Sequence, residues 1–391
     1  MQENDTDYVI RTGLQPCDVS PSEWDALLAR QDQPTPFMRH AYLQALHDSG
    51  SACAATGWQP AFAGVWQGGS LVAACPLYLK DHSYGEYVFD WAWADAYQRH
   101  GLRYYPKALI AVPFTPVPGS RLLARDAESR QRLMQAVMGW CEQSEHSSLH
   151  VLFASDADLR ATDAEGLMRR QTVQFHWQRQ GLCAFEDYLA TLTQEKRKKI
   201  RQERRRVSEA GVSFRHARGA DISAQDWAFF YQCYERTYLE HGNRPYLQPA
   251  FFAEMARSLP EHWLLFTAQR EGRDIACSLI GLHDEPGQPR VAYGRYWGAL
   301  ERVDCLHFEA CYYQPLSWCL NHGFERFEGG AQGEHKMARA LMPVSTHSAH
   351  WLAHPGFAQA VDDFLQREGT GVARYLEHLQ ERSPLRRIRP A

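Results

Sequence analysis

Nine consecutive residues, from Glu328 to Lys336, combine glycines with groups that can move protons or stabilise negative charge. The segment reads EGGAQGEHK and follows a short apolar stretch at 324–327, which predicts a β-strand. Three glycines let the backbone turn tightly and approach a ligand, while charged side chains gather where the strand ends. Acyl transfer to an amine needs a base for the ammonium proton and a donor for the tetrahedral oxyanion, and this segment contains both kinds of group.

The two chemical roles can be divided among the charged residues of this segment. The candidate base is Glu328, Glu334 or His335, and the candidate oxyanion donor is Lys336. The competing interpretation is a glycine-rich turn whose charges cap neighbouring helices. All four residues are therefore candidate catalytic residues, and the choice among the three bases stays open.

A second charged segment is the basic run EKRKKIRQERRR at 195–206, which has eight bases and two acids. The net charge of the whole chain is −4, so the remaining residues together carry −10. Apolar residues at three- and four-residue steps, such as Ile200 and Val207, predict a helix over 194–209 that docks along one stripe. Its outward bases, Lys198 and Arg201 among them, are candidate contacts for phosphate or nucleic acid, and a solvated helix face is the alternative.

The elements that must position these residues form an internal repeat. Residues 61–79 and 264–282 share an apolar run, a polar turn with Gly69 or Gly272, and a second apolar strand. The predicted flanking elements repeat in the same order in the two halves. In the first half, helices are predicted at 22–31, 40–48 and 127–144 and strands at 84–91 and 149–154. In the second half, helices are predicted at 223–240, 249–258 and 306–322 and strands at 290–297 and 324–328. This order is the layout of the GNAT acyltransferase fold. The sequence therefore predicts a mixed α/β tandem of two such domains, 1–165 and 166–391, the second including the basic helix.

Length and composition exclude several classes of protein. The 391 residues exceed the roughly 250–300 that one core usually supports, and 45% of them are hydrophobic, which is unlike a disordered chain. No apolar run reaches the ~18 residues of a spanning helix, and the first residues do not resemble a secretory signal, so we expect a cytoplasmic protein. The ten cysteines form no C-x-x-C pair, so neither a disulfide framework nor a thiolate metal site is expected.

Six strings, taken together, resemble the Fem-like family of N-acyltransferases of peptidoglycan biosynthesis or recognition. They are YYPK at 104–107, AVPFTPVPGSRLL at 111–123, QFHW at 174–177, KRKKIRQERR at 196–205, LHFEACYYQ at 306–314 and FEGGAQGEHKMAR at 327–339. The resemblance covers about residues 20–385 and implies a tandem GNAT fold related to the Fem aminoacyltransferases, which move an amino acid from aminoacyl-tRNA to an amine of a cell-wall precursor. It also implies that Lys336 matches a lysine associated with the tetrahedral intermediate. Where the family commonly has glycine and an aromatic residue, this chain has Ala340 and Leu341, a difference that bears on acceptor specificity.

The identity of the acyl donor depends on a second motif. An acetyl-CoA GNAT carries Q/R-x-x-G-x-G/A after its fourth strand, where backbone amides hold the pyrophosphate. Arg295 to Leu300 occupies that place but ends in leucine, which weakens the case for acyl-CoA. Aminoacyl-tRNA would instead meet the basic helix, which favours tRNA as the partner. Either donor would be a co-substrate, so no tightly bound cofactor and no metal are expected.

The remaining candidate residues are assigned to substrate binding. They are Tyr104, Tyr105, Lys107, His176, Trp177, Arg295, Trp297, His307, Glu309, Gln332 and Arg339. For the tyrosines and Lys107 the choice is between lining a cleft between the halves and packing in a core, and for Glu309 it is between binding an amine and capping its helix. The sequence therefore predicts an N-acyltransferase that delivers an acyl or aminoacyl group to an amine. Alternatives are a non-catalytic module for a peptidoglycan fragment or phosphorylated ligand, and a nucleic-acid-binding protein without turnover.

Overall fold

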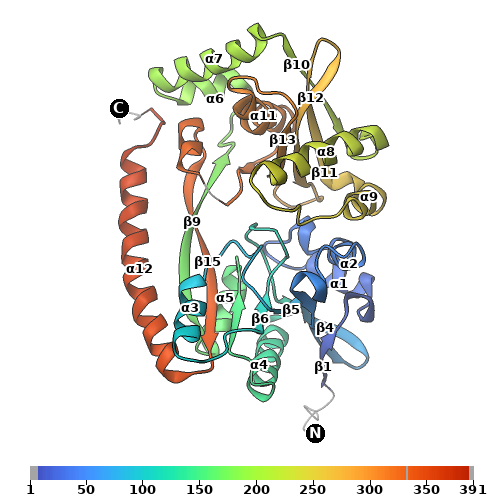
Figure 1. Ribbon diagram of the computed structural model, residues 1–391, viewed down its shortest axis with the longest axis vertical. Helices are drawn as coiled ribbons and strands as arrows, with labels where there is room; N and C mark the ends of the chain where they lie inside the picture. The colour runs from blue at the N-terminus through green and yellow to red at the C-terminus, as the bar shows by residue number, and fades with distance from the viewer. Residues whose placement is uncertain (1–7, 332, 387–391) are drawn as a thin grey trace. The chain divides into compact units, whose positions relative to one another are not determined.

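The computed structural model describes residues 8–331 and 333–386 (Figure 1). By its internal contacts the chain forms two compact units that interleave along the sequence. The first unit contains the residues up to 172 together with 246–251 and 345–373, and the second contains 173–245, 252–344 and the residues from 374 onward. Compactness alone does not mark homologous domains, so the division into 1–165 and 166–391 stays a prediction. None of the helices in the described ranges is both long and apolar enough to cross a membrane.

The first unit contains two β-sheets with the strand orders β1-β3-β4-β7 and β15-β8-β6-β5-β2. Its strands are β1 (Tyr8–Leu14), β2 (Trp58–Pro60), β3 (Phe62–Gln67), β4 (Ser70–Cys75), β5 (Leu77–Lys80), β6 (Lys107–Ile110), β7 (Leu123–Ala124), β8 (Ser148–Val151) and most of β15 (Met342–Leu352). Its helices are α1 (Pro21–Leu28), α2 (His40–Asp48), α3 (Trp91–Arg99), α4 (Ala127–Gln143), α5 (Asp156–Ala164) and most of α12 (Pro355–Glu381). The apolar face of α4, with Leu133 and Val137, packs on the buried strands because its leucine, methionine and valine residues recur at helical spacing.

The strands of the second unit are hydrogen-bonded in the order β10-β11-β12-β13-β14-β9. Its strands are most of β9 (Met168–Gln178), β10 (Val212–Arg218), β11 (Trp263–Arg270), β12 (Arg273–His283), β13 (Val291–Ala299) and β14 (Arg326–Glu328). Its helices are α6 (Phe185–Thr191), α7 (Gln194–Glu209), α8 (Ala224–Glu240), most of α9 (Pro249–Ser258), α10 (Leu306–Phe308) and α11 (Gln314–His322), and a π-helical turn at Glu309–Tyr313 joins the last two. The near-continuous apolar residues of β11 and β12 are buried because helices cover both faces of the sheet.

The internal repeat is confirmed by the turns and by the strand pairing. Gly68 and Gly69 join β3 to β4, and Glu271 and Gly272 join β11 to β12, and all four residues have positive φ, as a two-residue type I′ turn requires. In the first unit β5 pairs antiparallel with β6, and β6 pairs parallel with β8. The second unit repeats this with β12, β13 and β14. Both units therefore have the GNAT strand arrangement that the sequence predicts.

The strand predicted at 84–91 is wrong. Those residues form an irregular loop that leads into α3, and the next strand to pair with β5 is β6, further along the chain. Gly85 and Tyr87 both have positive φ, which a β-strand does not accommodate. The loop is fixed instead by polar contacts to Lys107, which are described below.

Candidate active site

A cavity lies in the second unit where β13 and β14 part. The two strands run parallel and pair only over 291–293 and 326–328, after which β13 continues to Ala299. A β-bulge at Arg295 interrupts the pairing of β13 with β12, since Leu279 pairs with Tyr296 and Ile280 with Gly294. The cavity has a volume of about 160 Å³ and is lined by Ser278, Ile280, Gly294, Arg295, Tyr296, Trp297, His307, Cys311, Tyr312, Phe327 and Gly329.

One wall of the cavity is the π-helical turn between α10 and α11. Cys311 and Tyr312 of this turn line the cavity, and the Ser278 hydroxyl of β12 donates a hydrogen bond to the Ala310 carbonyl at 2.6 Å. A π-turn inserts one extra residue into a helix and occurs often at functional sites. Here it brings a thiol and a phenol to the sheet face on which Phe327 also lies.

Lys336 lies next to this cavity, on the 3₁₀ turn Glu334–Arg339. Its Nζ donates a hydrogen bond to the Gly330 carbonyl at 3.0 Å, and only 4% of its surface is exposed. A Cβ on the cavity-lining Gly329 would lie 3.2 Å from Lys336 Cδ and 2.6 Å from Leu341 Cδ2, so a larger residue there would have to displace these side chains. Burial lowers the pKa of Lys336 from 10.5 to about 8, so its ammonium form persists near neutral pH.

Two histidines stand beside the same cavity. His307 lines it, and His335 Nε2 is 3.2 Å from the hydroxyl of Tyr312. Burial and then the nearby His335 and Arg339 lower the pKa of His307 to about 4, and burial and then Lys336 lower the pKa of His335. Both imidazoles are therefore neutral at physiological pH and can accept a proton.

The two acidic candidate bases lie elsewhere. Phe327 lines the cavity, so the next residue, Glu328, projects from the opposite face of the sheet, where it contacts Arg326 at 2.9 Å and lies 3.8 Å from His176. Burial raises the pKa of Glu328 to about 7. Glu334 is exposed and is held by Arg382 at 2.6 Å and by the Tyr375 hydroxyl at 3.2 Å. Of the four residues predicted to be catalytic, the structure brings only His335 and Lys336 to the cavity.

Several predicted binding residues have structural partners in the second unit. Trp177 of β9 is buried in the core, and the neighbouring His176 faces Glu328. Arg339 is buried against Glu203, and Glu309 is buried and accepts hydrogen bonds from Arg204 and Gln314, so Glu309 has its own cationic partner and is not open to an amine. Gln332 lies outside the described residues.

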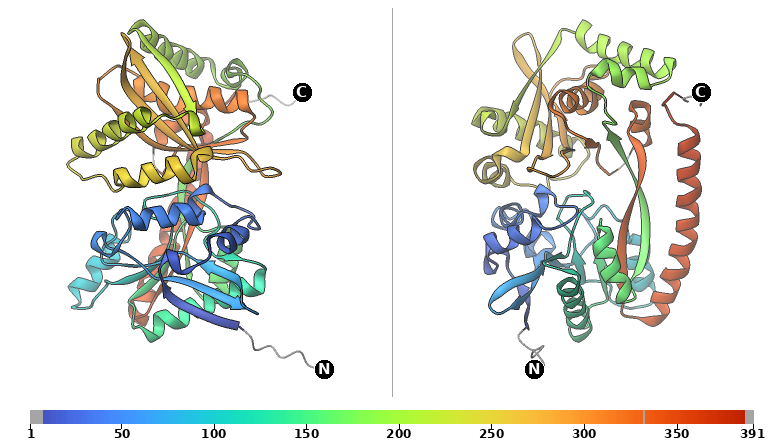
Figure 2. Two further views of the ribbon diagram at one scale, coloured as in Figure 1. Left: turned by 90° about the vertical axis from the view of Figure 1, so that its right-hand side faces the viewer. Right: turned by 180° about the vertical axis from the view of Figure 1, so that it is seen from behind.

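The predicted basic helix is confirmed as α7, with Ile200, Glu203 and Val207 on its buried side. Figure 2 shows this helix, in light green, lying next to β10 of the second unit. A hollow of about 680 Å³ on its outer side is lined by Gln194, Arg197, Lys198, Arg201, Gln202 and Arg205. Arg201 also pairs with Glu186 of α6 at 2.6 Å. The exposed face thus offers several cations along about three turns of helix.

The segment Arg295 to Leu300 has a packing role that the sequence analysis did not identify. Gly298 lies within β13, and a Cβ there would overlap the backbone of Cys233 in α8. The loop that follows lines a hollow of about 480 Å³, and its Asp304 pairs with Arg206 at 2.9 Å. The amides of Leu306 and Phe308 donate to the carbonyls of Val303 and Cys305. This glycine therefore serves helix-to-sheet contact.

Replacing Gly298 with alanine is expected to lower the free energy of unfolding by about 1–3 kcal/mol, because the added methyl group forces α8 away from β13. Urea denaturation followed by circular dichroism measures this. Gly139→Ala in α4 is the matched control, since a Cβ there meets open space, and it should stabilise slightly or leave stability unchanged. Equal stability of the two variants would contradict the packing role of Gly298.

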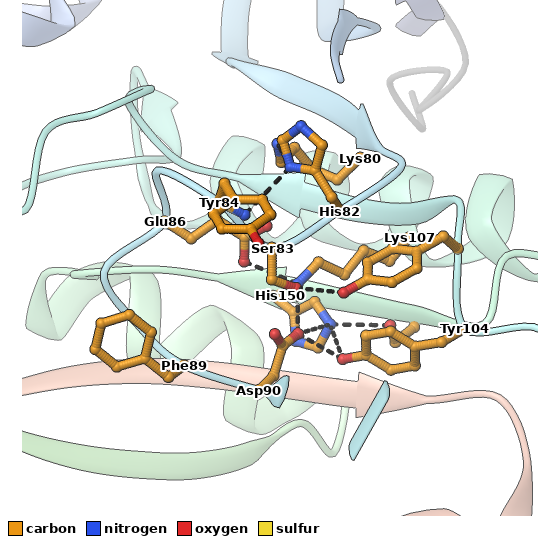
Figure 3. Close-up of polar contacts among 12 residues, drawn as sticks. Lys80, His82, Ser83, Tyr84, Glu86, Phe89, Asp90, Tyr104, Lys107 and His150 are labelled. Atoms are coloured by element: carbon orange, nitrogen blue, oxygen red, sulfur yellow. Dashed lines mark hydrogen bonds and ion pairs between the residues drawn. The ribbon is translucent and has the colours of Figure 1, made fainter. Parts of the chain in front are cut away.

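Tyr104, Tyr105 and Lys107 belong to a buried polar cluster in the first unit. Figure 3 shows Ser83, Asp90 and Tyr104 gathered around the Lys107 ammonium. Lys107 Nζ donates to Ser83 Oγ and to Glu86 Oε2, each at 2.8 Å, and to Asp90 Oδ2. The Tyr104 hydroxyl donates to Asp90 at 2.6 Å, and Tyr105 shares a hydrogen bond with Ser83 at 2.8 Å. Lys107 and Tyr104 are therefore enclosed by protein.

The charges in this cluster compensate one another. Burial alone would lower the pKa of Lys107, but Glu86 and Asp90 raise it above its ordinary value, so the ammonium form is favoured. Burial would likewise raise the pKa of Asp90, but Lys107 lowers it below the ordinary range. Sequence analysis does not identify Glu86 and Asp90 as partners of Lys107, because they lie in the segment 84–91 that it predicts as a strand.

Comparisons with known proteins agree on the fold. FemX has a TM-score of 0.55 at 10% identity, covering 88% of this chain and 98% of FemX. The C-terminal domain of a putative lysylphosphatidylglycerol synthetase from Agrobacterium fabrum has a TM-score of 0.54 at 10% identity, covering 89% of this chain and 96% of that domain. The L-PGS of Bacillus licheniformis has a TM-score of 0.52 at 11% identity, covering 88% of this chain and 97% of the L-PGS chain. No curated protein matches the sequence.

The tandem GNAT fold predicted from the element order is thus confirmed by two independent kinds of likeness, strand pairing within the chain and superposition on FemX. A family model described as peptidoglycan biosynthesis/recognition matches residues 16–387, nearly the whole chain. This match confirms the resemblance inferred from the six strings. The chain therefore belongs to the FemAB-like family.

Proposed function

We propose that the second unit transfers an acyl or aminoacyl group from an activated donor to an amine. The observation that carries this proposal is the cavity between β13 and β14, which has a buried lysine ammonium beside it and two neutral imidazoles around it. These are the two kinds of group that the reaction needs, a cation for the developing oxyanion and a base for the proton that the amine loses.

The reaction assigns a role to each group. The amine nitrogen attacks the carbonyl carbon of the donor, and Lys336 stabilises the negative charge that develops on the carbonyl oxygen. His307 or His335 accepts the ammonium proton, in preference to Glu328, which faces the other side of the sheet. The carbon–oxygen bond of an ester donor or the carbon–sulfur bond of a thioester then breaks, and the leaving group takes up a proton to leave as a hydroxyl or thiol.

The donor is proposed to be aminoacyl-tRNA in preference to acyl-CoA. The exposed cations of α7 provide a face for phosphates in the same unit as the cavity, and two amides of the loop after β13, those of Leu306 and Phe308, are used internally. One of the proteins similar in fold carries the name of a putative lysylphosphatidylglycerol synthetase, which supports aminoacyl transfer as chemistry that this fold can carry. The family description supports a peptidoglycan precursor as the source of the acceptor amine.

A donor screen tests the proposal. The purified chain is incubated with charged tRNAs or with acyl-CoAs, each with a set of amine-bearing peptidoglycan precursor fragments, and amide products are detected by mass spectrometry. We expect an amide product with at least one charged tRNA. A product formed only from acyl-CoA would overturn the donor assignment. Binding of the fragments without any product would favour the non-catalytic module.

Charge reversal on α7 is expected to weaken tRNA binding and its salt dependence. Each phosphate contact contributes roughly 0.7–0.9 to the slope of log affinity against log salt, so Lys198→Glu with Arg201→Glu should reduce the slope by about one to two. Fluorescence anisotropy of labelled tRNA at several salt concentrations measures this. Arg103→Glu with Arg160→Glu, both exposed in the first unit, is the control with the same change in net charge. Equal slopes for the two variants would identify α7 as an ordinary solvated face.

A further inference from the structure

Helix α7 carries a carboxylate on its buried side, opposite its exposed cations. The side chain of Glu203 is 7% exposed and lies 2.9 Å from Arg339 Nη2. It also accepts a hydrogen bond from the hydroxyl of Tyr313, in the last position of the π-turn. A carboxylate so enclosed is stable as an anion only while these donors remain in place.

Arg339, the partner of Glu203, is held on several sides. Its Nη1 donates to the His335 carbonyl at 3.0 Å, and its Nε donates to the Tyr313 hydroxyl at 3.1 Å. The guanidinium lies 3.6 Å from the ring centroid of Phe308. An arginine held by hydrogen bonds to three different groups and stacked on a ring has little freedom, so it fixes the backbone to which it bonds. That backbone belongs to the 3₁₀ turn Glu334–Arg339, in which Lys336 directly follows His335.

The neighbouring residue of α7 makes a second link to the cavity. Arg204 Nε donates to both carboxylate oxygens of Glu309 at 3.2 Å, and Gln314 donates to the same carboxylate at 2.8 Å. Glu309 begins the π-turn that carries the cavity-lining Cys311 and Tyr312. Glu203 and Arg204, two consecutive residues of α7, thus contact two segments beside the cavity. Glu203 bonds Arg339 of the turn that carries Lys336, and Arg204 bonds Glu309 of the π-turn.

We propose that Glu203 is a positioning residue that holds Lys336 beside the cavity by fixing Arg339 and, through it, the turn Glu334–Arg339. The role assigned to Lys336 rests on the proposed function, but its placement by Glu203 does not. If Glu203 only stabilised the core, removing its charge would lower stability and leave the surroundings of Lys336 in the folded protein unchanged. If it positions the turn, Lys336 gains exposure and loses its contact with the Gly330 carbonyl.

The test measures the pKa of Lys336 directly. The chain has six lysines, so carbon-13 labelling at lysine Cε gives few NMR signals, and Lys336→Arg identifies the one of interest. In the unaltered protein the Lys336 signal should titrate near pH 8, and in Glu203→Gln it should titrate at least one pH unit higher, toward the ordinary value of about 10.4. Glu209→Gln removes the same charge from the exposed side of α7 and should leave the titration unchanged.

An unchanged Lys336 titration in folded Glu203→Gln would overturn the proposal. If that variant fails to fold, Arg339→Lys keeps both charges but cannot hold Glu203, Tyr313 and the His335 carbonyl in the planar geometry of a guanidinium, and the same rise in the pKa of Lys336 is expected. An unchanged titration in Arg339→Lys would equally overturn the proposal. The donor screen tests the proposed function independently of this proposal. A protein that forms no amide product with any donor can still show the shifted titration of Lys336, and a protein that forms the product can show an unchanged one.

Discussion

Replacing Lys336 with alanine is expected to slow acyl transfer by about 10²–10³-fold, the order found when one oxyanion donor is removed. The ammonium of Lys336 lies beside the cavity, and its loss leaves the charge of the tetrahedral intermediate without this partner. Single-turnover rates with the donor that the screen identifies measure the chemical step. Circular dichroism and thermal unfolding of the variant check that it folds.

The pH dependence gives this prediction a second measurement. Because the pKa of Lys336 is about 8, the protonated form needed for oxyanion stabilisation is present below pH 8 and is lost as pH rises above it. The rate kcat/KM should therefore fall on the alkaline side with an apparent pKa near 8. Lys336→Arg keeps its charge at every accessible pH and should lose this decline. Normal turnover by Lys336→Ala would show that the cavity edge has no part in the chemistry.

Replacing Lys107 with methionine is expected to lower the free energy of unfolding by about 3–5 kcal/mol. The substitution keeps most of the side-chain volume but leaves the carboxylates of Glu86 and Asp90 buried without their shared cation. Removing one partner of a buried ion pair costs more than the pair itself contributes, because the remaining charge is not solvated. Equilibrium unfolding in urea measures the loss.

Lys198→Met is the matched control for Lys107→Met, since Lys198 is exposed on α7 and the same atoms are removed. It should change stability by less than about 0.5 kcal/mol. The triple variant Lys107→Met, Glu86→Gln, Asp90→Asn removes the unpaired charges and should recover part of the loss. A Lys107→Met protein as stable as the control would show that the cluster is not a structural anchor.

The features that the sequence predicts correctly depend on local patterns. The pair Gly68 and Gly69 favours a two-residue turn because both positions need positive φ, and apolar spacing places the Ile200 side of α7 against the protein. The strand before Gly329 and the turn that follows it were also expected from glycine and charge spacing. In each case neighbouring residues in the sequence determine the conformation.

The features that the sequence misses depend on distant residues. The aromatic segment at 84–91 has strand-like composition, but Glu86 and Asp90 bind Lys107, about 20 residues away, and the loop follows that contact. Glu328 and Phe327 are adjacent, so their side chains lie on opposite faces of β14. A shift of one residue in the pairing of β14 with β9 and β13 would exchange which of the two faces the cavity. Gly298 matched a ligand-binding pattern, yet its neighbour is Cys233 of α8.

The interleaving of the two units sets an order for their completion during synthesis. The sheet of the first unit needs β15, whose residues Ala349 to Leu352 pair with β8, and this strand is translated almost two hundred residues after β8. The segment up to 172 leaves the ribosome long before its last strand exists. By contrast, the cavity of the second unit is complete in sequence once Phe327 and Gly329 have been made. A nascent chain stopped near residue 340 would therefore contain every residue that lines the cavity. In that chain β8 could pair with β6, but β15, its partner on the other side, would not yet have been made.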